Sequence, residues 1–223
     1  LGKIVKPADS PVLQEKARAR VLDRLVKVLD GPLSKDAGTL SVLRRGFKDV
    51  NAHFTMCEFK PGDNLNPVVL DRYSKVRLRV MRQVHYSLAN AKKSIDLVFF
   101  VNGIPVATVE LKTSFTQSVQ HAIEQYKRDR LPKDPSSNKR EPLLAFGARA
   151  LVHFAVDDEE VWMSTHLQGA DSFFLPFNKG DDGRAGNPVN PTGPKTAYFW
   201  EETLERDTWL KLIGKYMHLL VER

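Results

Sequence analysis

Two carboxylates and a lysine near the middle of the chain form the pattern with the clearest chemical potential. They are Asp96 and, further along, Glu110 and Lys112, which are separated by Leu111. Carboxylate oxygens are hard ligands that suit Mg²⁺. A lysine beside them can lower the pKa of an attacking water, or stabilise the charge that grows on a phosphate in the transition state. Such a set of groups fits the hydrolysis of phosphodiester bonds.

The sequence around these three charges is almost entirely apolar. Residues 95–101 and 106–111 are aliphatic or aromatic except for the charges themselves and Thr108. Strands that are apolar on both faces belong in the middle of a protein, where a charge is costly unless it is paired or binds a metal. Glu110 and Lys112 are two residues apart and share a strand face, and Asp96 lies within about one residue of the position opposite them.

The dipeptide Asn102-Gly103 lies between these two runs and predicts a β-hairpin, because both residues tolerate positive φ. A strict two-residue turn sets Asp96 opposite Val109 rather than Glu110. A β-bulge or a three-residue loop brings Asp96 opposite Glu110. Pro105 has no N–H for the ladder and favours irregular pairing. The sequence therefore predicts a bulge or a wider loop in this hairpin.

A structural ion pair is the alternative explanation for the same charges. In that case Lys112 binds Asp96 or Glu110 at the end of a strand and no chemistry follows. For three charges taken from any sequence the ion pair is the commoner arrangement, so the choice depends on the surrounding residues.

The rest of the chain predicts a mixed α/β domain. Helices are expected over residues 11–30, 40–47, 116–130 and 197–221, with a helix or turn over 68–76. The helix over 11–30 carries an apolar face of Val12, Leu13, Ala17, Val21, Leu25 and Val28. Strands are expected over 77–87, where the alternation runs through Leu78, Val80, Gln83/Val84 and Tyr86, and over 149–156 and 160–167, around an Asp157-Asp158 turn. Ser114 or Thr116 is the expected cap of the helix over 116–130.

Composition narrows the classes of partner. The 223 residues are 42% hydrophobic, enough for a sizeable core, and no run approaches the ~18 apolar residues of a membrane span. The single Cys57 cannot form an internal disulfide, and the cytoplasm is the expected compartment. A net charge of +7 favours an anionic partner, with nucleic acid first, and we expect no membrane partner.

Longer stretches of sequence carry a family resemblance. The order Asp96, Glu110, Lys112 on a hairpin followed by a helix is the PD-(D/E)xK nuclease pattern. The segments around it closely resemble the amino-terminal region of the restriction subunit of type I restriction enzymes (HsdR). They are RQVHYS at 82–87, LVFFVNGIPVA at 97–107, ELKT at 110–113 and AIEQYKRDR at 122–130. Later segments at 141–146, 150–157, 174–180 and 196–202 resemble the same family.

The resemblance implies a restriction-endonuclease-like fold, with a mixed sheet flanked by helices, and a set of site residues. Asp96 and Glu110 would bind Mg²⁺ with the backbone carbonyl of Leu111, and Lys112 would be the catalytic lysine. The family also has an A-x-x-Q-x-x-x-Y motif on the next helix. Gln125 fits it as a further catalytic-site residue, but Asp129 stands where the tyrosine is expected.

The resemblance also divides the chain into parts. Residues 1–46 form an N-terminal helical part, and 47–177 form the PD-(D/E)xK nuclease core. Residues 178–195 form a loop with seven Gly or Pro residues, and 196–223 form a C-terminal helix that leads towards a motor domain. In the family that motor uses ATP. This sequence has no G-x-x-x-x-G-K-[ST] motif for binding it.

Duplex DNA is the expected substrate, and another subunit of the family's complex reads its sequence. Phosphate contacts are expected from Lys92, Lys93, Lys127, Arg128 and Arg130, which flank the site in sequence. The expected protein partners are the methyltransferase and specificity subunits and the motor domain of the same chain. The alternative function is a non-catalytic module that docks the motor on the modification complex.

Overall fold

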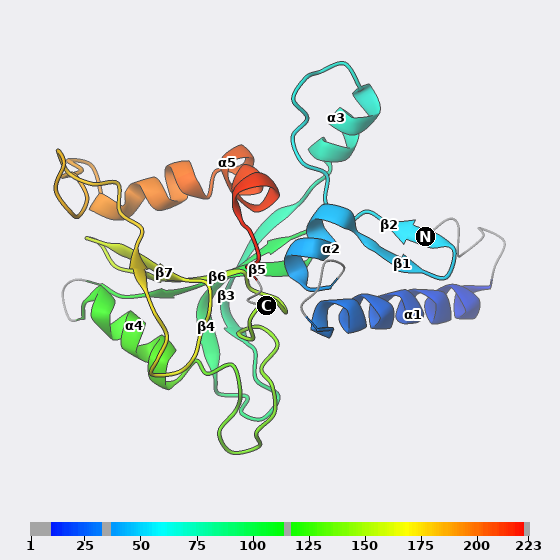
Figure 1. Cartoon of the computed structure of the whole chain (residues 1–223), viewed down its shortest axis with the longest axis horizontal. Coiled ribbons are helices and arrows are strands. Elements are labelled where there is room, and N and C mark those ends of the chain that lie inside the picture. Colours follow the sequence, from blue (N-terminus) through cyan, green and yellow to red (C-terminus); the bar gives the residue numbers. More distant parts are fainter. Residues whose placement is uncertain (1–9, 33–36, 114–116, 221–223) are drawn as a thin grey trace.

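The computed structural model describes residues 10–32, 37–113 and 117–220, and a six-stranded mixed sheet lies at its centre (Figure 1). The strands follow the order β3-β4-β5-β6-β7-β8. β3 (Leu78–His85), β4 (Ser94–Val101) and β5 (Ile104–Leu111) form an antiparallel meander. The expected α/β class, with a mixed sheet flanked by helices, is confirmed.

The second half of the sheet is reached through a crossover. α4 (Val119–Arg128) follows β5, and the chain returns as β6 (Val152–Val156) parallel to β5. β7 (Val161–Ser164) and β8 (Leu175–Pro176) then add to the sheet in antiparallel order. All five residues of β6 are buried, as expected of a central strand that is covered on both faces.

The hairpin of β4 and β5 has the irregular pairing that the sequence predicts. Asn102 and Gly103 form the turn with φ values of 49° and 86°. The register then shifts between Phe99 and Phe100, so that Val106 is the extra residue of a β-bulge. The predicted bulge is therefore confirmed, and the turn keeps its two residues.

Each face of the sheet carries its own core. On one face, β4, β5 and β6 pack against α2 (Thr39–Arg45) and α5 (Arg206–Lys211), with Val42 and Trp209 among the buried residues. On the other face they pack against α4, with Ile123 and Tyr126 buried. Figure 1 shows α5 above the sheet and α4 below it. The two layers make the middle strands apolar on both faces.

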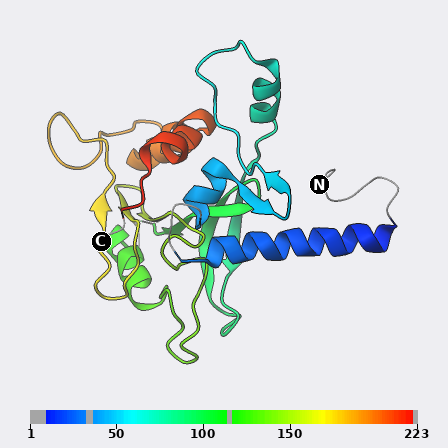
Figure 2. The same cartoon turned by 45° about the vertical axis from the view of Figure 1, so that its right-hand side comes forward.

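α1 (Pro11–Asp30) has the expected bounds and extends away from the sheet (Figure 2). Its expected apolar face packs on the core towards its C-terminal end, through the half-buried Leu25 and Val28. Val12 and Leu13 are 64% and 55% exposed. The Arg20 guanidinium binds the buried Asp49 carboxylate at 3.0 Å and ties the helix to β1. No helix within the described ranges is long and apolar enough to cross a membrane.

Three short elements lie between α2 and β3. β1 (Phe47–Asp49) and β2 (Ala52–Phe54) form a small hairpin, and α3 (Pro67–Ser74) follows in the region expected to be helix or turn. The small hairpin was not predicted, because a strand of three residues is too short to show an alternating pattern.

The expectation of one helix over 197–221 is wrong. The segment consists of four short pieces, η1 (Lys195–Ala197), η2 (Phe199–Thr203), α5 and η3 (Leu212–Tyr216). The break has a local cause, because Glu205 has extended backbone and its side chain accepts hydrogen bonds from the N–H groups of Asp207 and Thr208. Such capping starts a new helix and ends the previous one. The chain leaves helical geometry at Met217.

α4 starts later than expected, at Val119, and Ser118 is its N-cap. The expected caps Ser114 and Thr116 lie outside the described residues. A second cap comes from the turn between β6 and β7, where the buried Asp157 accepts the Val119 N–H at 2.7 Å. This carboxylate at the N-terminus of the helix fixes α4 on the sheet.

Candidate active site

The bulge places the two carboxylates on neighbouring strands at the same level. Because Leu97 pairs with Val109 after the shift, the next position of the register sets Asp96 opposite Glu110. Residues directly opposite in an antiparallel pair point to the same face. Thr108, which pairs with Val98, lies on that face and binds Tyr126 of α4. Asp96 and Glu110 therefore lie on the face that α4 covers.

Asp96 is half-buried and held by two hydrogen bonds. Its Oδ1 accepts the side-chain amide of Gln83 at 2.9 Å, and its Oδ2 accepts the backbone N–H of Leu111 at 2.9 Å. Gln83 has a φ of 49°, which is rare for a residue other than glycine and interrupts β3 opposite Asp96. These contacts fix the orientation of the carboxylate.

Glu110 has no exposed surface, and its two oxygens differ. Oε1 accepts a hydrogen bond from Nε of Arg130 at 2.6 Å, whereas the buried Oε2 has no hydrogen-bond partner. Burial raises the pKa of Glu110 to about 7, the Arg130 charge acts to lower it, and the nearby Asp96 raises it further. An unpartnered carboxylate oxygen in a buried position is a feature that a bound ligand would explain.

Lys112 is half-buried at the end of β5, and its ammonium group points to α4. Nζ donates to the side-chain oxygen of Gln125 at 2.7 Å, and the Lys112 backbone N–H donates to the Val156 carbonyl at 2.9 Å. The structure thus brings together Asp96, Glu110, Leu111, Lys112 and Gln125, which are the five residues expected at the site. Within the described residues Lys112 forms no ion pair with either carboxylate, and Glu110 pairs instead with Arg130.

Asp129 and Tyr126 take structural positions. Asp129, which stands where the family has a tyrosine, is the exposed C-cap residue of α4. Tyr126 is fully buried, and its hydroxyl lies 2.8 Å from the Thr108 hydroxyl, which is also 2.7 Å from Nδ1 of His153. Burial lowers the pKa of His153 to about 3. This buried network anchors α4 beneath the site.

The five basic residues expected to contact DNA do not have equivalent positions. Lys92 is exposed, Lys127 is half-buried, and Arg128 is exposed and pairs with Glu124 at 3.1 Å. Lys93 pairs with the buried Asp134 at 3.2 Å. Arg130 departs most from the expectation, because its side chain is only 12% exposed and its guanidinium is directed at Glu110 rather than at solvent.

The donor set limits which ions the site can hold. Across the part of the chain that the structure describes, no group of three or more His, Cys, Asp or Glu residues is arranged to hold a metal ion. At the site the protein offers two carboxylates and the backbone oxygen of Leu111. Mg²⁺ commonly uses one or two carboxylates and keeps several waters, so this oxygen-only set fits Mg²⁺ better than zinc.

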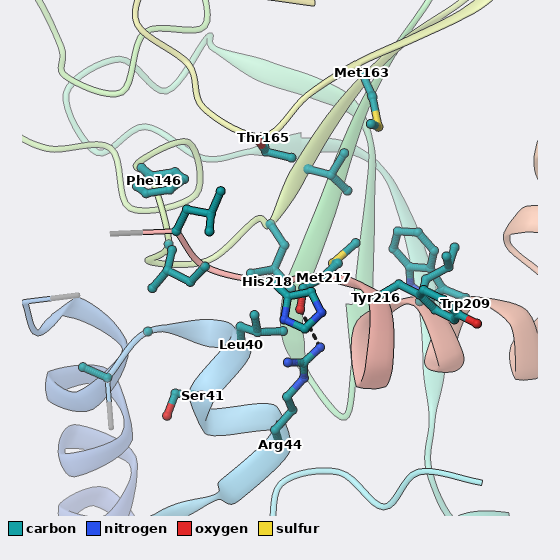
Figure 3. A pocket seen from close by; sticks show the side chains of 18 of the residues that line it. Leu40, Ser41, Arg44, Phe146, Met163, Thr165, Trp209, Tyr216, Met217 and His218 are labelled. Carbon is teal, nitrogen blue, oxygen red and sulfur yellow. Dashed lines mark hydrogen bonds between the residues drawn. The ribbon is translucent and has the colours of Figure 1, made fainter. Parts of the chain in front are cut away.

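A pocket of about 820 Å³ lies away from this site (Figure 3). None of the expected site residues lines it, and its walls are mostly apolar side chains of α2, β6, β7 and the C-terminal segment. Arg44 reaches across from α2, and its guanidinium donates to the carbonyls of Ile213 and Met217 at 2.5 and 2.7 Å. The pocket therefore offers mainly apolar contact and holds none of the residues expected at the site.

Sequence reasoning missed two residues that contact the carboxylates. Gln83 binds Asp96, and the available signal was the break in alternation at Gln83/Val84, which indicates an irregular strand. Arg130 was expected on the surface, because the run KRDR at 127–130 is typical of a solvated charged face. Only the turn after α4, where the Arg130 N–H binds the Gln125 carbonyl, shows that its side chain points inwards.

A six-stranded mixed sheet flanked by helices, with two carboxylates and a lysine on its central hairpin, defines a restriction-endonuclease-like α/β protein. The chain belongs to the family described as type I restriction enzyme R protein N terminus, whose model matches residues 13–172. The match starts within α1, well before residue 47, where the nuclease core is expected to begin, and stops before the segments at 174–180 and 196–202. The comparison with curated proteins gave no match. Membership implies an enzyme of several subunits that acts on DNA.

Proposed function

We propose that this chain is the endonuclease region of a type I restriction enzyme, and that it hydrolyses DNA phosphodiester bonds in a Mg²⁺-dependent reaction without reading sequence itself. The observation that carries the proposal is the buried and unpartnered Oε2 of Glu110, which lies beside Asp96 on the face covered by α4. A buried polar atom without a partner is a cost to folding. If Oε2 is a metal ligand, the bound Mg²⁺ is the partner of this atom in the active enzyme.

In this proposal Asp96 and Glu110 hold Mg²⁺ together with the Leu111 carbonyl. When bound, the ion supplies Lewis acidity that neutralises charge growing on the phosphate. Gln83 and the Leu111 N–H keep the Asp96 carboxylate oriented. Gln125 holds the Lys112 ammonium group, which would donate a hydrogen bond to the scissile phosphate and stabilise its transition state.

Contacts with DNA would be made to the phosphate backbone, which carries no sequence information. Three of the five basic residues do not form an ion pair with a buried carboxylate and remain candidates for these contacts. They are the exposed Lys92 and Arg128 and the half-buried Lys127. The specificity subunit would choose the site, the methyltransferase subunit would modify it, and the ATP-driven motor of the full subunit would deliver the DNA.

The test is cleavage by the complete restriction enzyme that contains Asp96→Asn, Glu110→Gln or Lys112→Ala. Each change should reduce DNA cleavage by about 100-fold or more, while ATP hydrolysis and DNA methylation persist. The exposed Asp171 offers a control, because Asp171→Asn changes a carboxylate far along the chain from the site. Loss of all three activities together would assign these residues to folding, and unchanged cleavage would refute the proposed site.

A further inference from the structure

Arg130 lies just beyond the end of α4 and turns back towards the sheet. Its Nε donates to Oε1 of Glu110 at 2.6 Å, and the two side chains are 12% and 0% exposed. An ion pair this deep loses most of its contact with water, so it persists only where its geometry is good. The proposed function above does not use Arg130.

The pairing of Arg130 with Glu110 is one-sided. Among the described residues, the buried side-chain nitrogen and oxygen atoms without a hydrogen-bond partner are Glu110 Oε2 and the Tyr86 hydroxyl. Both lie beside Arg130, since its charge acts on both groups. Arg130 therefore holds one oxygen of the Glu110 carboxylate and leaves the other, Oε2, without a hydrogen-bond partner, which is rare among the buried side-chain atoms of the described residues.

The same chain contains a pair with the opposite geometry. Arg149 binds Asp30 through two parallel hydrogen bonds, Nη1 to Oδ1 at 2.8 Å and Nη2 to Oδ2 at 3.3 Å. The Arg149 side chain is 14% exposed, close to the 12% of Arg130, whereas its partner Asp30 is 35% exposed and Glu110 is fully buried. Arginine–carboxylate pairs frequently take this two-oxygen arrangement, which satisfies both carboxylate oxygens. Arg130 instead engages one oxygen of Glu110 and leaves the other.

We propose that Arg130 is a positioning residue of the nuclease site, which fixes Oε1 of Glu110 so that Oε2 is presented to the metal beside Asp96. The inference rests on the proposed function. A guanidinium suits this task because it keeps its charge and has a rigid planar geometry. Arg130 then sets the conformation of Glu110 before the ion binds. Hydrogen-bond partners of metal ligands commonly orient the ligands in this way.

The test is the Mn²⁺ affinity of the full chain, measured by titration calorimetry without DNA. Arg130→Gln should weaken Mn²⁺ binding by about 10- to 100-fold, and Arg130→Lys should recover part of the loss. Arg149→Gln is the matched control. It should lower the thermal midpoint of unfolding, because it breaks the ion pair of a similarly buried arginine, but leave Mn²⁺ affinity unchanged.

Asp96→Asn separates this inference from the proposed function. If Asp96→Asn loses Mn²⁺ binding and a folded Arg130→Gln does not, the site stands and the role of Arg130 is overturned. If Asp96→Asn binds Mn²⁺ as well as the wild type does, the proposed metal site itself is wrong. Should Arg130→Gln not fold, Arg130→Lys decides, because wild-type affinity in that variant would overturn the positioning role.

Discussion

At the scale of single residues, Glu110 is subject to two opposing demands. The proposed chemistry requires a negative charge, and complete burial disfavours one, which raises the pKa of Glu110 to about 7. The Arg130 guanidinium opposes that shift and Asp96 adds to it. Glu110 is buried, lies close to a second carboxylate, and has a hydrogen-bond partner for only one of its oxygens. Such an arrangement does not favour the stability of the fold and is typical of a functional site.

Glu110 and His153 should make opposite contributions to the pH dependence of stability. Glu110 has its pKa raised from about 4.5 to about 7, so the native state binds more protons between these values, and its contribution is lost as pH rises through 7. The pKa of His153 is lowered from 6.5 to about 3, so its contribution is present above 6.5 and is lost as pH falls. The two effects oppose each other between about pH 4.5 and 6.5.

Urea unfolding followed by tryptophan fluorescence, at several pH values from about 5 to 8, would measure these contributions. Glu110→Gln should lose stability more steeply than the wild type when pH is lowered from about 6.5 to 5, by up to about 1.4 kcal/mol for each pH unit. Over the same fall in pH, His153→Gln should lose less stability than the wild type, or gain stability. If the wild type and both variants show the same dependence of stability on pH, the contributions of Glu110 and His153 are both contradicted.

The residues of the site were predictable to different degrees. Asp96, Glu110 and Lys112 stood out because charges interrupt apolar strands, and Gln125 followed from a motif on the next helix. Gln83 and Arg130 were not predictable in their roles, because each acts through a local departure from regular structure. The positive φ of Gln83 and the turn after α4 depend on tertiary packing that the pattern of residue types does not contain.

At the scale of elements, one acidic residue joins the turn between β6 and β7 to the start of α4. Asp157 follows β6, and its Oδ1 accepts the N–H groups of Glu159 and Glu160 at 2.8 Å, which closes the turn to β7. Its Oδ2 accepts the Val119 N–H at the start of α4. Because α4 also carries Gln125, the position of this helix on the sheet determines where Lys112 is held.

Asp157→Ala should lower the free energy of unfolding by roughly 1–3 kcal/mol, because it removes a helix cap and leaves the buried Val119 N–H unpaired. It should also reduce DNA cleavage, since α4 loses an anchor beneath Gln125. Asp171→Ala, at an exposed position, is the control and should change stability by less than about 0.5 kcal/mol. Chemical denaturation of both variants measures the difference, and equal stabilities would show that Asp157 does not hold the helix.

Local signals explain which elements were predictable. The hairpin and its bulge followed from Asn102-Gly103, Pro105 and the spacing of the charges, all within a short stretch. The C-terminal segment was misread because its apolar residues are spaced as in a continuous helix, whereas Glu205 caps a new helix in the middle. Periodicity could not reveal that break, since the capping depends on the side chain of a single residue.

At the scale of the whole molecule, the charge is basic but dispersed. The chain carries 34 Lys and Arg residues against 27 Asp and Glu residues, and the net charge is +7. Near the proposed site, Lys93 and Arg130 are paired with buried carboxylates. Lys92, Lys127 and Arg128 remain as candidate phosphate contacts, so this surface alone offers few charges for binding DNA.

The chain on its own should therefore bind duplex DNA weakly, and supercoiled plasmid should be cut slowly or not at all near physiological salt, even with Mg²⁺. If Lys92, Lys127 and Arg128 each neutralise one phosphate, the logarithm of the binding constant should fall with the logarithm of salt with a slope of about −3. Replacing all three with Ala should bring the slope close to zero. Replacing the exposed Lys16, Lys48 and Lys215 instead should leave the slope unchanged.

The consequence for cleavage is tested by incubating plasmid and Mg²⁺ with the wild-type chain and with the Asp96→Asn chain over a range of salt. Rapid cutting at high salt by the wild type alone would support the chemistry and refute the idea that weak DNA capture limits it.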